Sequence, residues 1–205
     1  MPVCGSWRAS VVSGGGGGGS TLLINETSSW KYVRGTNEAS APTTAWRALN
    51  FDDSLWAVGN TPIGYDPAVT MNTPLPDMNA NYTSFFLRKK FVVTDRALIN
   101  SLTLEALYDD GFKLWINGSN VVNASMPAGE ATFFDVATGA ARESASYDAF
   151  ALNGFQNYLI DGTNIIAVQV HNLLTNGSSD CYFDCRLRAT TGSGVTRGPD
   201  RSTVG

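Results

Sequence analysis

Residues 107–122, LYDDGFKLWINGSNVV, decide the class of fold. Phe112, Leu114 and Ile116 alternate with other residues, and a period of two is typical of a β-strand with one buried face. The Asn-Gly pair that follows is the strongest short signal for a β-hairpin, because both residues tolerate a positive φ. We therefore expect an antiparallel hairpin whose inner face belongs to a hydrophobic core.

The register of this hairpin has two forms. A two-residue loop pairs Ile116 with Ser119 and Leu114 with Val121, whereas a four-residue loop pairs Ile116 with Val121. Both forms direct Trp115 to the opposite face of the sheet. There the indole is either an exposed platform for a sugar ring or a side chain packed beneath a loop, and packing is favoured because large aromatic side chains usually find cover.

Asp109 and Asp110 raise the question of whether the stretch performs chemistry. Glycoside hydrolysis needs two carboxyl groups roughly 5–10 Å apart on either side of one bond. Neighbouring residues of an extended chain point to opposite faces of the sheet, so these two acids make a poor pair. We expect them at the rim of the sheet, where they shape a turn and at most one faces a ligand or an ion.

The same alternation recurs along most of the chain. It predicts strands at 99–107, 112–117, 163–172 and 181–189, with turn residues between them. A further strand is expected at 84–93, with both faces partly apolar. Helical signals are confined to short segments near 51–56 and 148–160. Because no alternation of strands and helices is present, the sequence predicts an all-β fold, a jelly-roll β-sandwich with long loops and flexible termini.

Composition divides the chain into three parts. The run SGGGGGGS at 13–20 is typical of a flexible linker, so residues 1–21 are interpreted as a glycine-rich N-terminal arm. Residues 22–190 are expected to form the β-sandwich domain, and 191–205 to form a C-terminal tail or linker.

Charge and hydropathy exclude two classes of partner. A net charge of -4 and scattered basic residues argue against a nucleic acid, whose phosphates need clustered Lys and Arg. Membrane insertion is not expected, because no apolar run approaches the roughly 20 residues that a spanning helix needs. The N-terminus lacks the basic-then-apolar order of a secretory signal. Either the chain is a fragment of a longer exported protein, or it leaves the cell by another route such as lysis of a host by a virus.

Cys181 and Cys185 are four residues apart within an expected strand. That spacing corresponds to about 13 Å in an extended chain, whereas disulfide-bonded residues have Cα atoms about 5.5 Å apart. We expect two buried thiols on the face that carries Phe183 and Leu187. A bridge to Cys4 remains an alternative.

His171 is the only histidine. A catalytic triad could be drawn with Ser178 or Ser179 and Asp180, but the Gly-x-Ser-x-Gly nucleophile turn is missing. The histidine is therefore interpreted as a structural residue or as a hydrogen-bonding group for a ligand, and the chain is not expected to be an enzyme.

Calcium is the one cofactor that the sequence could accommodate. Carboxylates and carbonyls in the loops FDDS at 51–54, YDDG at 108–111 and NGSSD at 176–180 could supply the six to eight oxygens that calcium takes. The alternative is that these Asp residues only cap turns. Zinc would need more Cys and His ligands than this spacing offers.

Several segments, taken in order, resemble one known module. They are SSWKYV, AWRALNFDDSLWAVGNTPIGYD, YTSFFLRKKFVV, LTLEALYDDGFKLWINGSNVV, DGTNIIAVQVHN and SSDCYFDCRL. This order is similar to that of the galactose-binding-domain-like jelly-roll modules appended to many bacterial extracellular enzymes and surface proteins. The resemblance implies an aromatic framework of Trp30, Trp46, Trp56 and Tyr65, an acidic turn at 109–111, and a last long loop with His171, Asn172 and Asp180. Cys181 and Cys185 depart from the pattern.

Two functions follow as expectations. The first is a non-catalytic carbohydrate-binding module for a glycan or polysaccharide. Its ligand-binding residues would be Tyr65, Asp109, Asp110, Trp115, His171, Asn172 and Asp180. The alternative is a structural subunit of a virion, as a capsid decoration or fibre protein, or of a cell-surface assembly that forms homo-oligomers through the N-terminal arm. Both functions place the chain outside the cell, on a cell surface or on a virion surface.

Overall fold

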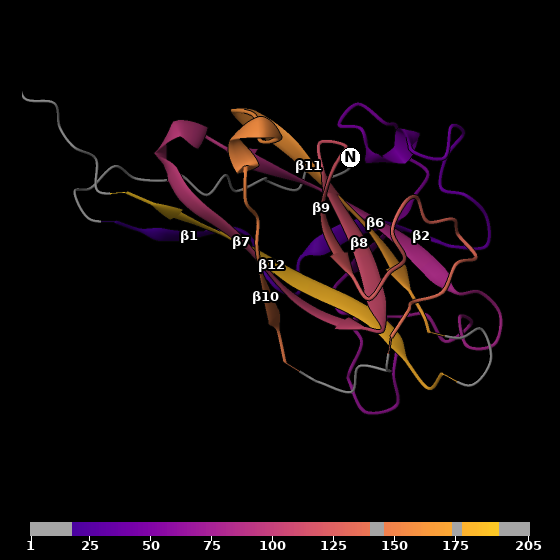
Figure 1. The fold of residues 1–205 in the computed structure, drawn as a ribbon. Helices are drawn as coiled ribbons and strands as arrows, with labels where there is room; N and C mark the ends of the chain where they lie inside the picture. Colours follow the sequence, from indigo (N-terminus) through magenta and orange to yellow (C-terminus); the bar gives the residue numbers. More distant parts are fainter. Residues whose placement is uncertain (1–17, 140–145, 174–177, 193–205) are drawn as a thin grey trace, which may run out of the picture.

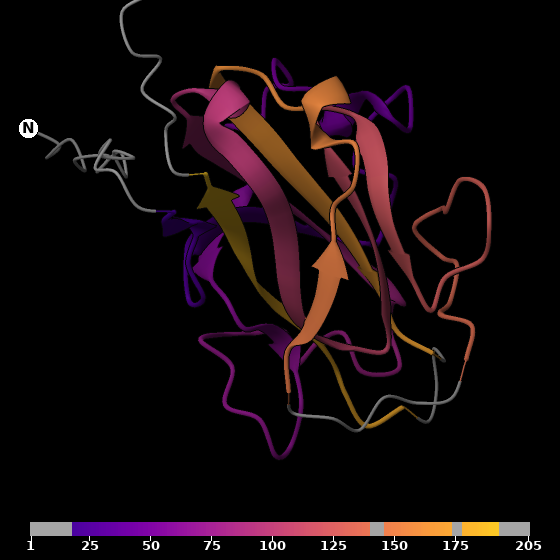
Figure 2. The ribbon, with the colours of Figure 1, turned by 60° about the vertical axis from the view of Figure 1, so that its left-hand side comes forward.

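The computed structural model describes residues 18–139, 146–173 and 178–192, which form two β-sheets packed face to face (Figures 1 and 2). The first sheet has the strand order β10-β7-β12-β4-β5, with β1 also paired to β12, and the second has the order β3-β2-β6-β11-β8-β9. The strands are β1 (Ser20–Ile24), β2 (Ser29–Arg34), β3 (Ala57–Asn60), β4 (Ile63–Tyr65), β5 (Thr73–Pro74), β6 (Ser84–Val93), β7 (Ile99–Asp109), β8 (Gly111–Ile116), β9 (Ser119–Ala124), β10 (Asp148–Ala151), β11 (Gly162–His171) and β12 (Cys181–Thr191). The predicted all-β sandwich is confirmed.

The predicted hairpin is β8–β9, and it uses the two-residue loop. Asn117 and Gly118 have φ angles of 50° and 86°, and Ile116 pairs with Ser119. A β-bulge then shifts the register, so that Leu114 pairs with Val122 and not with Val121 as the regular two-residue form predicts. A bulge places two residues of one strand against one of the other, which alternation alone does not reveal.

The core between the sheets comes from the alternating positions. Phe112, Leu114 and Ile116 of β8 pack there against residues of both sheets. Cys181 and Cys185 of β12 are free thiols with no exposed surface, and they share this core with Phe183 and Leu187. The expectation of buried thiols is confirmed for this pair, whereas Cys4 lies outside the described residues.

Of the two short helical segments predicted, the one near 148–160 contains a 3-10 helix, whereas the one at 51–56 does not. Residues 51–56 form a turn, in which the Asp52 carboxylate accepts a hydrogen bond from the Ser54 backbone N–H at 2.9 Å. The 3-10 helices are η1 (Ala45–Arg47), η2 (Arg96–Leu98) and η3 (Phe155–Asn157). The segment 148–160 therefore contains a strand, β10, before a single helical turn. None of the described helices is long and apolar enough to cross a membrane.

Strand pairing reaches slightly beyond the predicted domain of 22–190. The first strand begins at Ser20 and the last ends at Thr191, and the backbone N–H of Thr191 donates to the Gly19 carbonyl at 2.8 Å. The rest of the predicted N-terminal arm, residues 1–17, lies outside the described residues.

Candidate functional site

Trp115 is packed beneath a loop. Its indole, 3% exposed, lies on the outer face of the second sheet in a cluster with Trp46, Phe86 and Ala167. The ring of Trp46 meets it edge-on at a centroid distance of 5.5 Å, and the guanidinium of Arg47 lies 3.8 Å over its ring. Of the two alternatives for Trp115, packing is therefore the one observed.

His171 is also buried on this outer face, with no exposed surface. Its Nδ1 lies 2.8 Å from the Asp135 carbonyl oxygen, and since a carbonyl can only accept, Nδ1 carries the proton. Burial lowers the pKa of His171 to about 4, so the ring is neutral near pH 7. The hydroxyls of Ser178 and Ser179 donate to Asp180 at 3.0 and 3.1 Å. The described hydrogen bonds thus form no serine–histidine pair.

Five of the seven predicted ligand residues gather at one end of the sandwich. We call them, with the thiol that they surround, the rim cluster: Tyr65, Asp109, Asp110, Asn172, Asp180 and Cys181. Burial, with a smaller electrostatic contribution from the three Asp residues, raises the pKa of the Cys181 thiol far above its usual range. The signal that unites these residues is their place at strand ends, which the resemblance also implied.

The rim cluster is largely internal. The Asn172 amide donates to the Tyr65 hydroxyl at 2.7 Å, and Asp110 accepts a hydrogen bond from the Leu173 backbone N–H at 2.6 Å. Asp109 and Asp110 are each 2% exposed, so neither side chain faces solvent. Both residues lie at the connection from β7 in the first sheet to β8 in the second sheet. Burial raises the pKa of Tyr65 to about 12. Ligand binding by these residues stays a prediction, and the geometry assigns them to packing.

Calcium also stays a prediction. Across 18–139, 146–173 and 178–192, no group of three or more His, Cys, Asp or Glu side chains is placed to hold a metal ion. Asp52 caps a turn and Asp53 pairs with Arg88, as expected if these acids serve the loops.

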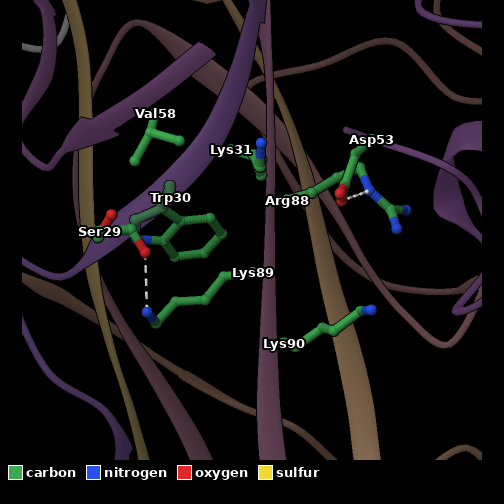
Figure 3. Close-up of a pocket in the computed structure, with 8 residues that line it drawn as sticks. All are labelled: Ser29, Trp30, Lys31, Asp53, Val58, Arg88, Lys89 and Lys90. Carbon is green, nitrogen blue, oxygen red and sulfur yellow. Dashed lines mark hydrogen bonds and ion pairs between the residues drawn. The ribbon is translucent and has the colours of Figure 1, made fainter. Parts of the chain in front are cut away.

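A pocket that the sequence did not predict opens inside the second sheet. Strands β2 and β6 pair as far as Lys31 opposite Arg88 and then separate, because Ser29 and Trp30 continue along β3 while Lys89 and Lys90 continue along β11. The resulting cavity of about 360 Å³ is the β2–β6 pocket (Figure 3). It is lined by Ser29, Trp30, Lys31, Asp53, Val58, Arg88, Lys89 and Lys90.

The inner part of this pocket combines an indole with an ammonium group. Trp30 is 1% exposed and packs edge-on against Phe183 at a centroid distance of 6.4 Å. Its Nε1–H is buried and has no acceptor among the described residues. Lys89 donates from Nζ to the Ser29 carbonyl at 2.8 Å, and burial lowers its pKa. In Figure 3 both side chains lie on the same side of the strand that carries the lysines.

The outer part of the pocket is held by Arg88, which has no exposed surface. Its Nε donates to the Asp53 carboxylate at 2.8 Å, and its Nη1 donates to the Ala48 carbonyl at 3.1 Å. These bonds fix the loop that contains Asp53 against the sheet. Lys31 contributes in the same way, donating to the Trp56 carbonyl at 3.1 Å.

One signal could have revealed this site. In β6, the positions of Phe85, Leu87 and Phe91 face the core, and Lys89 occupies the same register. A lysine in an inward position of a strand is unusual, since buried charges need partners. The partner strand β2 lies far away in the sequence, so the pocket itself was not predictable from either segment.

A second hollow of about 390 Å³ lies beside the rim cluster, along the loop that follows β4. Its lining combines apolar side chains such as Pro67, Val69 and Met71 with the polar residues Tyr65, Asp66 and Thr70. Its one charged group, Asp66, already accepts a hydrogen bond from the Val69 backbone N–H at 2.8 Å. Among the residues described, the lining of this hollow contains no basic side chain, whereas three lysines and Arg88 line the β2–β6 pocket.

The comparisons with known proteins agree on the fold. No family model matches the chain, and no curated protein matches it. Among solved structures, a beta-glucuronidase of Bacteroides uniformis is similar over 84% of this chain and 18% of its own, at 18% identity and a TM-score of 0.52. Bacteroides uniformis beta-glucuronidase 2, covalently bound to cyclophellitol-6-carboxylate aziridine, gives the same identity, coverage and TM-score. The chain is thus similar in fold to a β-sandwich portion of these much longer enzymes, and it spans less than a fifth of their length.

Proposed function

We propose that this chain is a non-catalytic carbohydrate-binding module whose glycan enters the β2–β6 pocket. The observation that carries the proposal is the composition of that pocket. Its volume of about 360 Å³ lies in the usual range for small-ligand sites, roughly 300–1,000 Å³. Val58, which is 64% exposed, supplies an apolar surface for the face of a pyranose ring, while Ser29, Lys90 and Asp53 supply donors and acceptors for its hydroxyls.

The fold supports this proposal in a general way. A sandwich similar to a small part of beta-glucuronidase chains fits an accessory domain that holds a sugar while another domain performs catalysis. The activity of those enzymes is not proposed for this chain. The expected location outside the cell, on a cell surface or on a virion surface belongs to the same proposal.

A polysaccharide array followed by calorimetric titration tests the proposal. We expect millimolar to micromolar affinity, about -4 to -8 kcal/mol, as is ordinary for a shallow site. Val58→Gln replaces an apolar wall of the pocket with an amide and should weaken binding about tenfold, because one apolar contact contributes roughly 1–3 kcal/mol. The matched control is Val92→Gln, at another exposed valine of the same sheet, which should bind as the wild type does.

Two outcomes would contradict the proposal in different ways. If no polysaccharide binds, the carbohydrate-binding function is wrong. If Tyr65→Phe abolishes binding and Val58→Gln does not, the glycan binds at the rim cluster and the assignment of the pocket is wrong. The alternative function, a virion or cell-surface assembly subunit, depends on the N-terminal arm at 1–21 and stays a prediction.

A further inference from the structure

Resting on that proposed function, we infer that the glycan is acidic. A carboxylate or sulfate group of the sugar enters the β2–β6 pocket, where it contacts the ammonium of Lys89 and the indole N–H of Trp30. A carboxylate and a sulfate are both oxyanions whose oxygens only accept hydrogen bonds, so the two donors of the pocket would recognise either group.

The charge of the pocket is the first support. The chain has four lysines and a net charge of -4, yet three of those lysines, Lys31, Lys89 and Lys90, line this one cavity. The only carboxylate in the lining is Asp53, which is paired with Arg88 at 2.8 Å. The pocket therefore concentrates positive charge in a protein that is acidic as a whole. A concave site lined by one sign of charge favours ligands of the opposite sign.

The buried donors are the second support. Trp30 lines the pocket, and its Nε1–H is buried and lacks an acceptor within the described part of the chain. Such a buried donor costs about 1–3 kcal/mol when it stays unpaired, so an acceptor that reaches it would bind favourably. The Lys89 ammonium has three N–H donors, of which one is directed to the Ser29 carbonyl. An anion between these two groups would also offset the desolvation that lowers the pKa of Lys89.

A second carboxylate close to the pocket in the sequence, that of Asp52, does not serve as the anionic partner of Lys89. Asp52 precedes Asp53 in the same loop, and hydrogen bonds from Ser54, with a smaller electrostatic contribution from Lys31, lower its pKa. Its oxygen accepts from the Ser54 backbone N–H at 2.9 Å, and it does not line the pocket. Among the residues that the structure describes, Lys89 donates to the Ser29 carbonyl and forms no ion pair with a carboxylate.

The test compares pairs of polymers that differ in their acidic groups. Polygalacturonate is compared with its methyl ester, and dextran sulfate with dextran, by calorimetric titration of the whole chain. We expect the acidic member of at least one pair to bind about tenfold more tightly, as charge-assisted hydrogen bonds contribute roughly 1.5–3 kcal/mol. A preference only in the first pair assigns a carboxylate, and a preference only in the second assigns a sulfate.

Three variants locate the acidic group. Lys89→Met keeps the apolar stem and removes the charge, and Trp30→Phe keeps a ring and removes the N–H donor. Both should reduce the preference for the acidic polymer to less than about threefold. Arg34→Met removes the same charge from β2, at an exposed position outside the pocket, and should leave the preference intact. Far-ultraviolet circular dichroism and the unfolding midpoint establish that each variant is folded.

The outcomes separate this inference from the proposed function. Equal binding of polygalacturonate and its ester, and of dextran sulfate and dextran, overturns the inference and leaves glycan binding standing. Absence of binding to every polysaccharide overturns both. A preference that survives in folded Lys89→Met and Trp30→Phe places the anion elsewhere and overturns the inference. If polyglutamate binds as tightly as the acidic polysaccharide, the ligand is an acidic peptide, and the inference of an acidic glycan is overturned.

Discussion

Arg88, Lys89 and Lys90 are consecutive in the sequence but have three different surroundings. Arg88 is fully buried on the outer face of the sheet, Lys89 points inward and is half-buried, and Lys90 is exposed. Alternation along β6 explains why Lys89 differs in direction from its neighbours. It does not explain why a charge is tolerated there, and the separation of β2 from β6 provides that explanation.

His171 gives a prediction at the same scale, for the dependence of stability on pH. Its pKa is about 4 when folded, against about 6.5 when unfolded. Between these values only the unfolded chain is protonated, so the free energy of unfolding falls as the pH falls through this window. We expect the histidine to account for a loss on the order of 3 kcal/mol. Urea unfolding at pH 7 and at pH 4 measures it.

The matched variant is His171→Gln, which does not titrate. Its stability should fall less than that of the wild type over the same pH range, and the difference between the two proteins isolates the histidine from the acids that titrate alongside it. Asp135 and Lys113 are the charged residues that act most directly on the ring. Equal losses in the two proteins would show that His171 is not held neutral by the fold.

At the scale of elements, the loop at 125–139 covers the outer face of the second sheet. Carbonyls of this loop accept hydrogen bonds from Gln169, at 3.1 Å, and from His171, at 2.8 Å. The loop also approaches the glycine of the opening DDG stretch closely. A Cβ atom at Gly111 would lie 2.9 Å from the Ser125 carbonyl oxygen and 2.9 Å from the Ala137 Cβ. The glycine therefore sets how closely the loop can pack.

Gly111→Ala should destabilise the chain by about 1–3 kcal/mol, the usual effect of overpacking, because backbone atoms must move. Gly118→Ala is the comparison: a Cβ there has open space around it, and only its φ of 86° opposes the substitution. That variant should lose about 1 kcal/mol. Denaturant unfolding of both variants measures the difference. If Gly111→Ala proves the milder change, the close approach of the loop is wrong.

For the molecule as a whole, the sequence was sufficient to predict the all-β sandwich and its long strands. The expected strand at 84–93 is β6, in which both faces are buried at 84–88 and exposed and buried positions alternate from 90 to 93. The sequence could not predict which loops cover which face, since that depends on contacts such as Arg88 with Asp53. For the same reason the sequence indicated the residues of the rim cluster but not that they are buried. It also did not predict the pocket that forms where β2 separates from β6.

The two unbridged thiols in the core have a further consequence for the whole molecule, because the rate at which they react reports how often the sandwich opens. Cys181 and Cys185 are fully covered, and burial raises the pKa of both, so the reactive thiolate is scarce and a reagent reaches it only when the sandwich opens. In a Cys4→Ser background, a chromogenic disulfide reagent should label the native chain at least about 1,000-fold more slowly than the denatured chain. The protection factor would then report the free energy of opening, and immediate labelling of the native chain would contradict the packing of β12.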